Sequence, residues 1–288
     1  MDSVAITFIQ VLSAVASIAL LSIGLALIFG MMRVINLAHG EFLMLGAYSL
    51  LVAIKHGVNL WFAMFVIAPL FVGLIGVVLE RIVVRHLYGR MTDTLLATWG
   101  ISLLITGLMT TIFGNTMEGV STPLGSFQIG GLSDSVYKFF ILAITVLTFA
   151  GVYAALRFTR WGLVARATMD NPTQASVLGI SPSRVYTVTF AAGAALSGLA
   201  GAVFAPVSGV LPTMGDAYIA KTFITVIGGG GAIIRGTAAA SALFGTVSQV
   251  VTYLSSAVIG DVALLVSAII LLRLLPQGIT GRYFKKSL

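Results

Sequence analysis

The chain has 288 residues and a mass of 30.1 kDa, and 58% of its residues are hydrophobic while only 9% are charged. Because a soluble domain carries about 25% charged residues, these charged side chains are too few to cover the surface of a soluble protein of this size. The composition excludes a soluble enzyme and predicts an all-α polytopic membrane protein, with a single transmembrane domain over residues 1–288 and about eight transmembrane helices.

Nine apolar runs, bounded by charges and turn residues, mark the predicted spans. They lie near residues 5–29, 42–54, 60–79, 94–113, 137–156, 185–205, 222–234, 237–257 and 262–275. A helix needs about 20 apolar residues to cross a bilayer core of about 30 Å, so the second and seventh runs are too short to cross alone. Each adjoins a polar or glycine-rich stretch, and we expect broken or re-entrant helices there.

The basic residues predict the orientation of these spans. Of the 16 lysines and arginines, 13 fall on one side of the membrane, and only Lys55, Lys138 and Lys221 fall on the other. Since basic residues prefer cytoplasmic loops, we expect the N-terminus outside and the C-terminus in the cytoplasm. The same asymmetry accounts for the net charge of +7. No nucleic-acid partner is expected, because no aromatic residues interleave with these arginines.

The segment from Asn36 to Glu41 places polar and ionisable groups between a long apolar run and a short one. Such groups are costly at membrane depth. One interpretation is a helix interruption that lines a substrate path. The path residues would then be Asn36, His39, Gly40 and Glu41. The alternative is an interfacial turn in which Glu41 caps a helix or pairs with Arg33, and the residues alone favour neither interpretation.

A stretch at about 157–184, on the side predicted to be cytoplasmic, is too long and too polar for a simple turn. The residues Asp170 to Pro172 supply a helix N-cap followed by proline at the first helical position, and Gly179 supplies a stop. We expect a helix of about two turns between them. Its apolar side, Ala175 with Leu178, needs a cover from this protein or from another.

Two later stretches are rich in small residues. In the run at 185–205 they recur at spacings of three and four residues, which permits close contact between helices. These residues are Ala191, Ala194, Ala195, Gly198, Gly201 and Ala202. Four glycines, Gly228 to Gly231, follow later, and each costs about 1 kcal/mol relative to alanine in a helix. They mark either a break that lines a substrate path, through Gly228, Gly229 and Gly230, or a place of close helix packing.

The sequence shows no catalytic or metal-binding motif. It has no cysteine, no G-x-x-x-x-G-K-[ST] phosphate loop, no H-E-x-x-H helix and no G-x-S-x-G nucleophile elbow. The three histidines, His39, His56 and His86, are scattered over loops, whereas a metal site needs three or four converging ligands. We therefore expect no catalytic residue, no metal ligand and no enzymatic activity in this chain.

Motifs that resemble those of one family extend over nearly the whole chain. They run from Gly24 to Gly30, Val34 to Phe42, Ala165 to Ala175, Leu178 to Ile180, Leu196 to Ala202, Val226 to Gly229 and Pro276 to Gly278. In order and spacing the chain resembles the permease subunits of ABC importers for branched-chain amino acids, the LivH type. It departs from them between Gly230 and Gly236, where the family more often has a serine or threonine and a proline.

The resemblance implies a non-catalytic permease subunit in a bacterial plasma (inner) membrane, which moves branched-chain or other hydrophobic amino acids into the cytoplasm. The implied partners are a second homologous permease subunit, two cytoplasmic ATPase subunits, an external or periplasmic substrate-binding protein and membrane lipid. No cofactor is expected on this chain, whereas ATP and magnesium are expected on the ATPase subunits. By resemblance, the helix from Pro172 to Leu178 is the coupling helix that seats in the ATPase. The expected coupling residues are Arg166, Asp170, Asn171, Pro172, Ala175, Leu178 and Gly179.

Other functions stay open at this point. Similar importers handle urea, short amides or other small polar metabolites, and composition does not discriminate between these cargoes. A stand-alone secondary transporter or channel would place coupling carboxylates or histidines inside the spans, whereas here most ionisable residues sit at span ends. A purely structural scaffold would need neither glycine breaks nor a docking helix.

Overall fold

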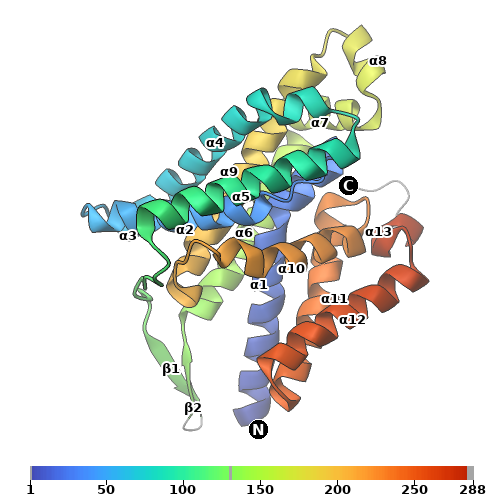
Figure 1. The fold of residues 1–288 in the computed structure, drawn as a ribbon. Coiled ribbons are helices and arrows are strands. Elements are labelled where there is room, and N and C mark those ends of the chain that lie inside the picture. Colours follow the sequence, from blue (N-terminus) through green and yellow to red (C-terminus); the bar gives the residue numbers. More distant parts are fainter. Residues whose placement is uncertain (1, 130–131, 284–288) are drawn as a thin grey trace. The chain divides into compact units, whose positions relative to one another are not determined.

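The computed structural model describes residues 2–129 and 132–283, and helices make up most of them (Figure 1). In chain order the elements are α1 (Asp2–Met32), α2 (His39–Lys55), α3 (Leu60–Phe62), the π-helical turn η1 (Ala63–Ile67), α4 (Ala68–Ile82), the 3-10 turn η2 (Val84–Leu87), α5 (Met91–Phe113), β1 (Ser126–Ile129), β2 (Leu132–Ser135), α6 (Tyr137–Phe158), α7 (Arg160–Asp170), α8 (Pro172–Val177), α9 (Pro182–Ser208), α10 (Met214–Gly229), α11 (Ile233–Leu254), α12 (Ala257–Leu274) and α13 (Gly278–Tyr283).

Six helical stretches of the described residues are long and apolar enough to cross a membrane. They are Ile6–Met32, Leu60–Ile82, Met91–Phe113, Tyr137–Phe158, Pro182–Ser208 and Ala257–Gly281. The pair of α10 and α11, bent by 118° at the glycine break, makes up to seven if it counts as one span. The chain is therefore an all-α polytopic membrane protein, to which the strands β1 and β2 add an antiparallel hairpin.

The two short apolar runs behave differently from ordinary spans. The run at 42–54 lies in α2, whose 17 residues cover only about 26 Å at 1.5 Å per residue. Most residues of α2 are buried by protein. The break expected in the run at 222–234 is confirmed, because α10 ends at Gly229, α11 begins at Ile233 and the two helices are bent by 118°. The bounds of the run are wrong, since α10 already begins at Met214. Gly230 lies between them with a φ of +83°, a left-handed conformation that stops a helix.

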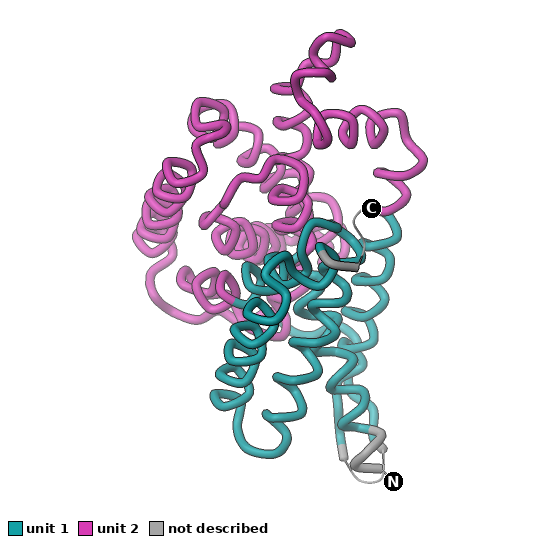
Figure 2. Tube along the Cα trace, turned by 90° about the vertical axis from the view of Figure 1, so that its right-hand side faces the viewer, with its two compact units in different colours: residues 1–22, 121–151, 221–288 teal, residues 23–120, 152–220 magenta. Residues whose placement is uncertain are grey.

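The chain forms two compact units (Figure 2). Unit 1 comprises residues 1–22, 121–151 and 221–288, and unit 2 comprises residues 23–120 and 152–220. Helices α1, α6 and α10 each contribute one part to unit 1 and another part to unit 2.

In unit 2 the long helix α9 packs closely along α2 and α4. A Cβ on Gly201 would overlap the carbonyl oxygen of Leu43, and one on Gly46 would overlap the carbonyl oxygen of Gly198. On α4, a Cβ on Gly76 would lie 2.6 Å from the Cβ of Ala194. The prediction that small residues of α9 permit close helix contact is confirmed, since the backbones approach only where side chains are absent or small.

Unit 1 has its own apolar core, to which α1, α11 and α12 contribute. The core residues are Ile18, Ala240, Phe244, Leu264, Ala268 and Leu271. The hydroxyl of Thr145 on α6 donates to the carbonyl oxygen of Ala16 at 3.1 Å. A Cβ on Gly245 of α11 would lie 2.8 Å from the Cα of Val15. These contacts hold α1, α6 and α11 against one another.

Candidate functional site

The backbone between α1 and α2, residues 33–38, is not helical, and it is supported by polar groups of unit 2. The side-chain oxygen of Asn36 accepts the backbone N–H of Ala38 at 3.1 Å. The N–H of Leu37 donates to the hydroxyl of Thr98 on α5 at 3.1 Å. Irregular backbone in a membrane protein needs such partners, because no lipid group supplies them.

The first residues of α2 form a buried polar cluster with α5 and α9. His39 is fully buried, and its Nδ1 lies 3.1 Å from the hydroxyl oxygen of Ser197. Ser102 donates to Oε1 of the buried Glu41 at 2.6 Å. The prediction that all three histidines lie in loops is wrong for His39, which begins a helix. In the part of the chain that the structure describes, Glu41 neither caps a helix nor pairs with Arg33.

Close packing and two unsatisfied polar atoms distinguish this cluster. A Cβ on Gly40 would lie 2.7 Å from the carbonyl oxygen of Gly215 in α10, so the two backbones are in direct contact. Within the described residues, Nδ2 of Asn36 and Oε2 of Glu41 are buried without a hydrogen-bond partner. Buried polar atoms are normally paired. The Asn36–Glu41 cluster therefore has one donor and one acceptor available for water or for a polar solute.

The glycine run lies in unit 1, whereas the Asn36–Glu41 cluster lies in unit 2. A Cβ on Gly228 would lie 2.9 Å from the ring of Phe244, and one on Gly229 would lie 2.6 Å from the carbonyl carbon of Gly236. These two glycines are thus used for close helix packing, as one of the two interpretations of the sequence expects.

The third glycine makes the turn between α10 and α11. Gly230 has a φ of +83°, and Thr280 of α13 bonds to both sides of the turn. Its hydroxyl donates to the carbonyl oxygen of Gly229 at 2.6 Å and accepts the N–H of Ala232 at 3.2 Å. That Gly228, Gly229 and Gly230 also line a substrate path stays a prediction.

The polar stretch at 157–184 contains two helices, α7 and α8, where the sequence predicted one. The side chain of Asn171 caps α8 by accepting the N–H of Gln174 at 3.1 Å, and Gly179, which follows the C-cap residue Leu178, has a φ of +82°. Asp170 is the exposed last residue of α7. Arg166 donates to the carbonyl oxygen of Gly162 within the same helix at 3.3 Å.

The exposed side of α8 differs from the predicted one. Ala175 is buried with 2% exposure, whereas Leu178 is 78% exposed, so these two residues do not share an uncovered face. The residue that sequence reasoning missed is Val177, which is 83% exposed beside Leu178. We call Val177 and Leu178 the α8 apolar tip, and in water such a tip favours a partner surface.

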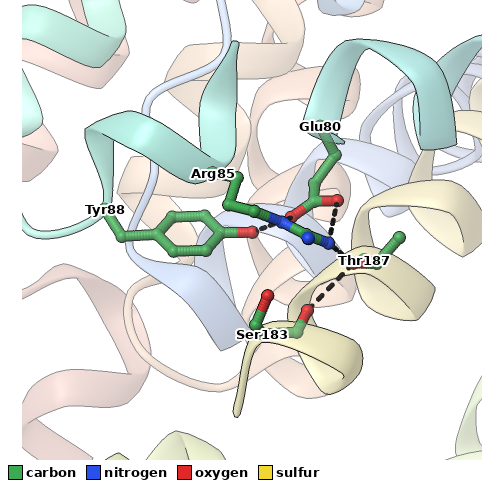
Figure 3. Close-up of polar contacts among 5 residues, drawn as sticks. All are labelled: Glu80, Arg85, Tyr88, Ser183 and Thr187. Atoms are coloured by element: carbon green, nitrogen blue, oxygen red, sulfur yellow. Dashed lines mark hydrogen bonds and ion pairs between the residues drawn. The ribbon is translucent and has the colours of Figure 1, made fainter. Parts of the chain in front are cut away.

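A second buried polar cluster, which sequence reasoning missed, joins α4 and the following loop to the beginning of α9 (Figure 3). Arg85 Nε and Nη2 lie 3.3 Å from the two carboxylate oxygens of the fully buried Glu80. Nη2 also donates to the hydroxyl of Thr187 at 2.8 Å, and that hydroxyl lies 2.9 Å from the carbonyl oxygen of Ser183. The hydroxyl of Tyr88 donates to Glu80 as well. We call these residues the Glu80 cluster.

The Glu80 cluster connects the chain that follows α8 to the body of unit 2. Burial raises the pKa of the Tyr88 phenol, and its bond to Glu80 raises the pKa further, so the phenol remains a donor. A signal for the cluster was present in the sequence, since Glu80 ends an apolar run five residues before Arg85.

The described residues contain no group of three or more His, Asp or Glu side chains that could hold a metal ion. His56 is exposed near the end of α2, and its Nδ1 lies 2.8 Å from the carbonyl oxygen of Val52. The polar clusters are built from hydrogen-bonding groups that suit an organic solute or a structural role.

Comparison with known proteins gives one consistent result. The family model described as the permease component of the branched-chain amino acid transport system matches residues 7–275. The chain is 28% identical to the probable branched-chain amino acid transport permease protein LivH of Methanocaldococcus jannaschii, over 93% of this chain and 90% of that protein.

Two further relatives are the high-affinity branched-chain amino acid transport system permease proteins LivH of Escherichia coli K12 and BraD of Pseudomonas aeruginosa. Each is 26% identical to this chain, over 92% of this chain and 91% of the relative. No solved structure matches the chain.

Proposed function

Because the chain belongs to the family of permease components of branched-chain amino acid transport systems, we propose that it moves branched-chain or other hydrophobic amino acids into the cytoplasm as a subunit of an ATP-driven importer. The observation that carries this proposal is the family match over residues 7–275, which includes every candidate membrane span apart from the ends of two. The chain is a multi-pass protein of the inner membrane and a transport permease. The cargo is inferred from the names of relatives that are 26–28% identical.

The permeases of this family work with ATPase and substrate-binding partners. For this chain the proposed assembly contains a second homologous permease subunit, two cytoplasmic ATPase subunits that hold ATP and magnesium, and one external binding protein. The asymmetry of basic residues supports an N-terminus outside and a C-terminus in the cytoplasm. The proposed permease is one transmembrane domain of about eight helices, with α2 and the bent α10–α11 pair as its short or broken members.

The Asn36–Glu41 cluster is the proposed polar part of the substrate path. An amino acid carries an ammonium and a carboxylate group, which need an acceptor and a donor when they leave water. The free Oε2 of Glu41 and Nδ2 of Asn36 are one of each. Non-helical backbone at membrane depth commonly lines such a site.

The α8 apolar tip is the proposed contact with the ATPase. α8 has a side-chain cap at Asn171 and a glycine stop at Gly179, so its ends are well defined. A movement of Val177 and Leu178 would be transmitted to α9 through the short connection between α8 and α9. The bonds of Arg85 to Thr187 and Glu80 would then couple α9 to α4.

The cargo is tested by reconstituting the permease with its candidate ATPases and binding protein in proteoliposomes. Uptake of leucine, urea and a short amide is measured with and without ATP. ATP-dependent leucine uptake is the expected result. Uptake of urea or the amide alone would assign the chain to another cargo, and uptake of leucine without any ATPase would identify a stand-alone transporter.

The coupling role is tested by Leu178→Asp and Ala175→Pro. Leu178→Asp changes an exposed residue and should leave membrane insertion intact, while proline at Ala175 removes an N–H that donates to the carbonyl oxygen of Asn171 at 3.0 Å. Both should lose ATPase co-purification or uncouple ATP hydrolysis from uptake. The matched control is Leu124→Asp, an exposed leucine in the loop before β1. Normal ATP-driven uptake by purified Leu178→Asp complexes would contradict the coupling role.

A further inference from the structure

A pocket of about 500 Å³ lies in unit 1, separate from the Asn36–Glu41 cluster. It is formed by α1, α6 and α11, and we call it the α1–α6–α11 pocket. Its lining residues are Gln10, Ser13, Ala14, Ser17, Lys138, Gln249, Thr252 and Tyr253. This volume is within the range of small-molecule sites.

The chemistry of the lining does not suit lipid. Apart from Ala14, each lining residue has a polar side-chain group. On α1, the residues Gln10, Ser13 and Ser17 follow the spacing of one helix face, although this helix belongs to a highly apolar span. Polar groups that face a hydrocarbon interior cost free energy, so a polar face on such a span points to a polar occupant.

In the described part of the chain, the side chains of Gln10 and Gln249 each have an unpaired hydrogen-bonding group. Nε2 of Gln249 lies 3.5 Å from Oε1 of Gln10, at the limit of a hydrogen bond. Among the described residues neither side chain makes another hydrogen bond, so Nε2 of Gln10 can donate and Oε1 of Gln249 can accept. The amide pair thus offers both a donor and an acceptor across the pocket.

The charged group of the pocket is part of a neutral pair. Lys138 Nζ lies 2.7 Å from a carboxylate oxygen of Asp134. An ammonium group has three N–H donors, so Lys138 can still donate to a ligand while Asp134 balances its charge. Because this ion pair has no net charge, the pocket offers one ammonium donor together with uncharged amide and hydroxyl groups, a set that can pair both ends of a zwitterion without an excess charge.

We propose that the α1–α6–α11 pocket binds a small zwitterionic solute, the class to which free amino acids belong. The carboxylate of the solute accepts from Lys138 and from the amide of Gln10, and its ammonium donates to the amide oxygen of Gln249 and to the hydroxyls of Ser13 and Ser17. In identifying the solute with the cargo, this inference rests on the proposed function.

The decisive variant replaces both amides, Gln10→Leu together with Gln249→Leu. Because both partners of the weak amide bond are removed, no polar group is left unpaired and the fold should be kept. A second variant, Ser13→Leu, fills the pocket. The matched control is Thr111→Val, an exposed threonine on α5 whose hydroxyl donates only to the carbonyl oxygen of Gly107.

Two measurements are made, one on the permease–ATPase complex in nanodiscs without the binding protein, and one on the complete complex in proteoliposomes. Saturation-transfer NMR with leucine should give a weaker signal for the double variant and for Ser13→Leu than for wild type and for Thr111→Val. In uptake assays the KM for leucine should rise at least tenfold in the double variant and stay unchanged in Thr111→Val.

The outcomes separate the pocket from the proposed function. An unchanged KM and NMR signal in the double variant would overturn the pocket as a zwitterion site. Loss of the second permease subunit from the purified double variant would also overturn it, because the polar face would then be a subunit contact. A wild-type complex that binds leucine in the pocket but imports no amino acid would contradict the proposed function and support the pocket.

Discussion

At the residue scale, the two buried glutamates differ in how completely they are paired. Glu80 contacts Arg85 and Tyr88, whereas Glu41 accepts from Ser102 through Oε1 and its Oε2 is buried without a hydrogen-bond partner among the described residues. A buried carboxylate costs free energy unless donors surround it. The full pairing of Glu80 is typical of a structural role, and the unpaired oxygen of Glu41 is the observation on which its proposed place in the substrate path depends.

The structural role of the Glu80 cluster predicts the effect of Arg85→Leu. This change leaves the buried carboxylate without its cation, so we expect the free energy of unfolding to fall by about 3 kcal/mol. Thermal unfolding of the purified chain in detergent, followed by tryptophan fluorescence, measures it. The control is Lys55→Leu, which removes the cation of the more exposed pair with Glu118 and should cost less than about 1 kcal/mol. If the two variants lowered the free energy of unfolding equally, the structural role of the Glu80 cluster would be contradicted.

At the scale of elements, glycines decide how closely the helices of each unit pack. The backbone of α9 contacts that of α2 at Gly201 and Gly198, while the backbone of α10 contacts that of α11 at Gly229 and Gly236. In membranes the packing of small residues is a main source of helix association. Added methyl groups at these positions should therefore have larger effects than at glycines that face open space.

The contact of α2 with α9 is tested by Gly201→Ala. Its methyl group would overlap the carbonyl oxygen of Leu43, so we expect a loss of about 2–3 kcal/mol in stability or a failure to fold. Gly107→Ala on α5 is the control, because no atom lies within 4 Å of the added carbon. That control should be neutral or slightly stabilising. Comparable melting temperatures for both variants would contradict the packing of α9 on α2.

The role of the glycine break is tested by Gly229→Val, with Gly231→Val as the control. The valine at 229 would lie 2.6 Å from the backbone of Gly236, whereas nothing lies within 4 Å of a Cβ at 231. We expect Gly229→Val to lower stability by about 2–3 kcal/mol and Gly231→Val to leave it nearly unchanged, as measured by unfolding in detergent. If Gly229→Val keeps wild-type stability and loses uptake, the glycine lines the path and does not act through packing.

At the scale of the whole molecule, the distribution of charge predicts the orientation in the membrane. The hairpin of β1 and β2 belongs to the segment that carries few basic residues, whereas α7 and α8 lie in the arginine-rich stretch. Basic segments stay in the cytoplasm during insertion. The hairpin and α8 should therefore face opposite sides of the membrane.

The absence of cysteine makes this orientation directly testable. Thr122→Cys, in the loop before β1, should react with a membrane-impermeant maleimide in cells with an intact inner membrane. Thr173→Cys, in α8, should react only after that membrane is permeabilised, and both threonines are exposed in the structure. The unsubstituted chain, which has no cysteine, gives the background level of maleimide labelling. If Thr173→Cys alone were labelled in intact cells, the orientation would be opposite to the proposed one.

Much of the fold could be predicted from the sequence because apolar run length and turn residues act locally. The run at 94–113 lies in α5, and Asn171 with Gly179 encloses a short helix as expected. The faces of α8 could not be predicted, because the burial of Ala175 and the exposure of Leu178 depend on contacts outside the helix. The same limit applies to His39, whose partner Ser197 is 158 residues away.

The sequence by itself determined that the chain is a polytopic helical membrane protein, where its helices are interrupted, and to which family it is similar. These properties follow from hydropathy, glycine and proline, and motif order, which need no contact between distant residues. Only the tertiary structure decided that Glu41 is held by Ser102, that Glu80 is held by Arg85 and Tyr88, and that polar faces of α1, α6 and α11 line an open pocket. The physical reason is that burial and hydrogen bonding between helices depend on how the folded chain brings distant segments together.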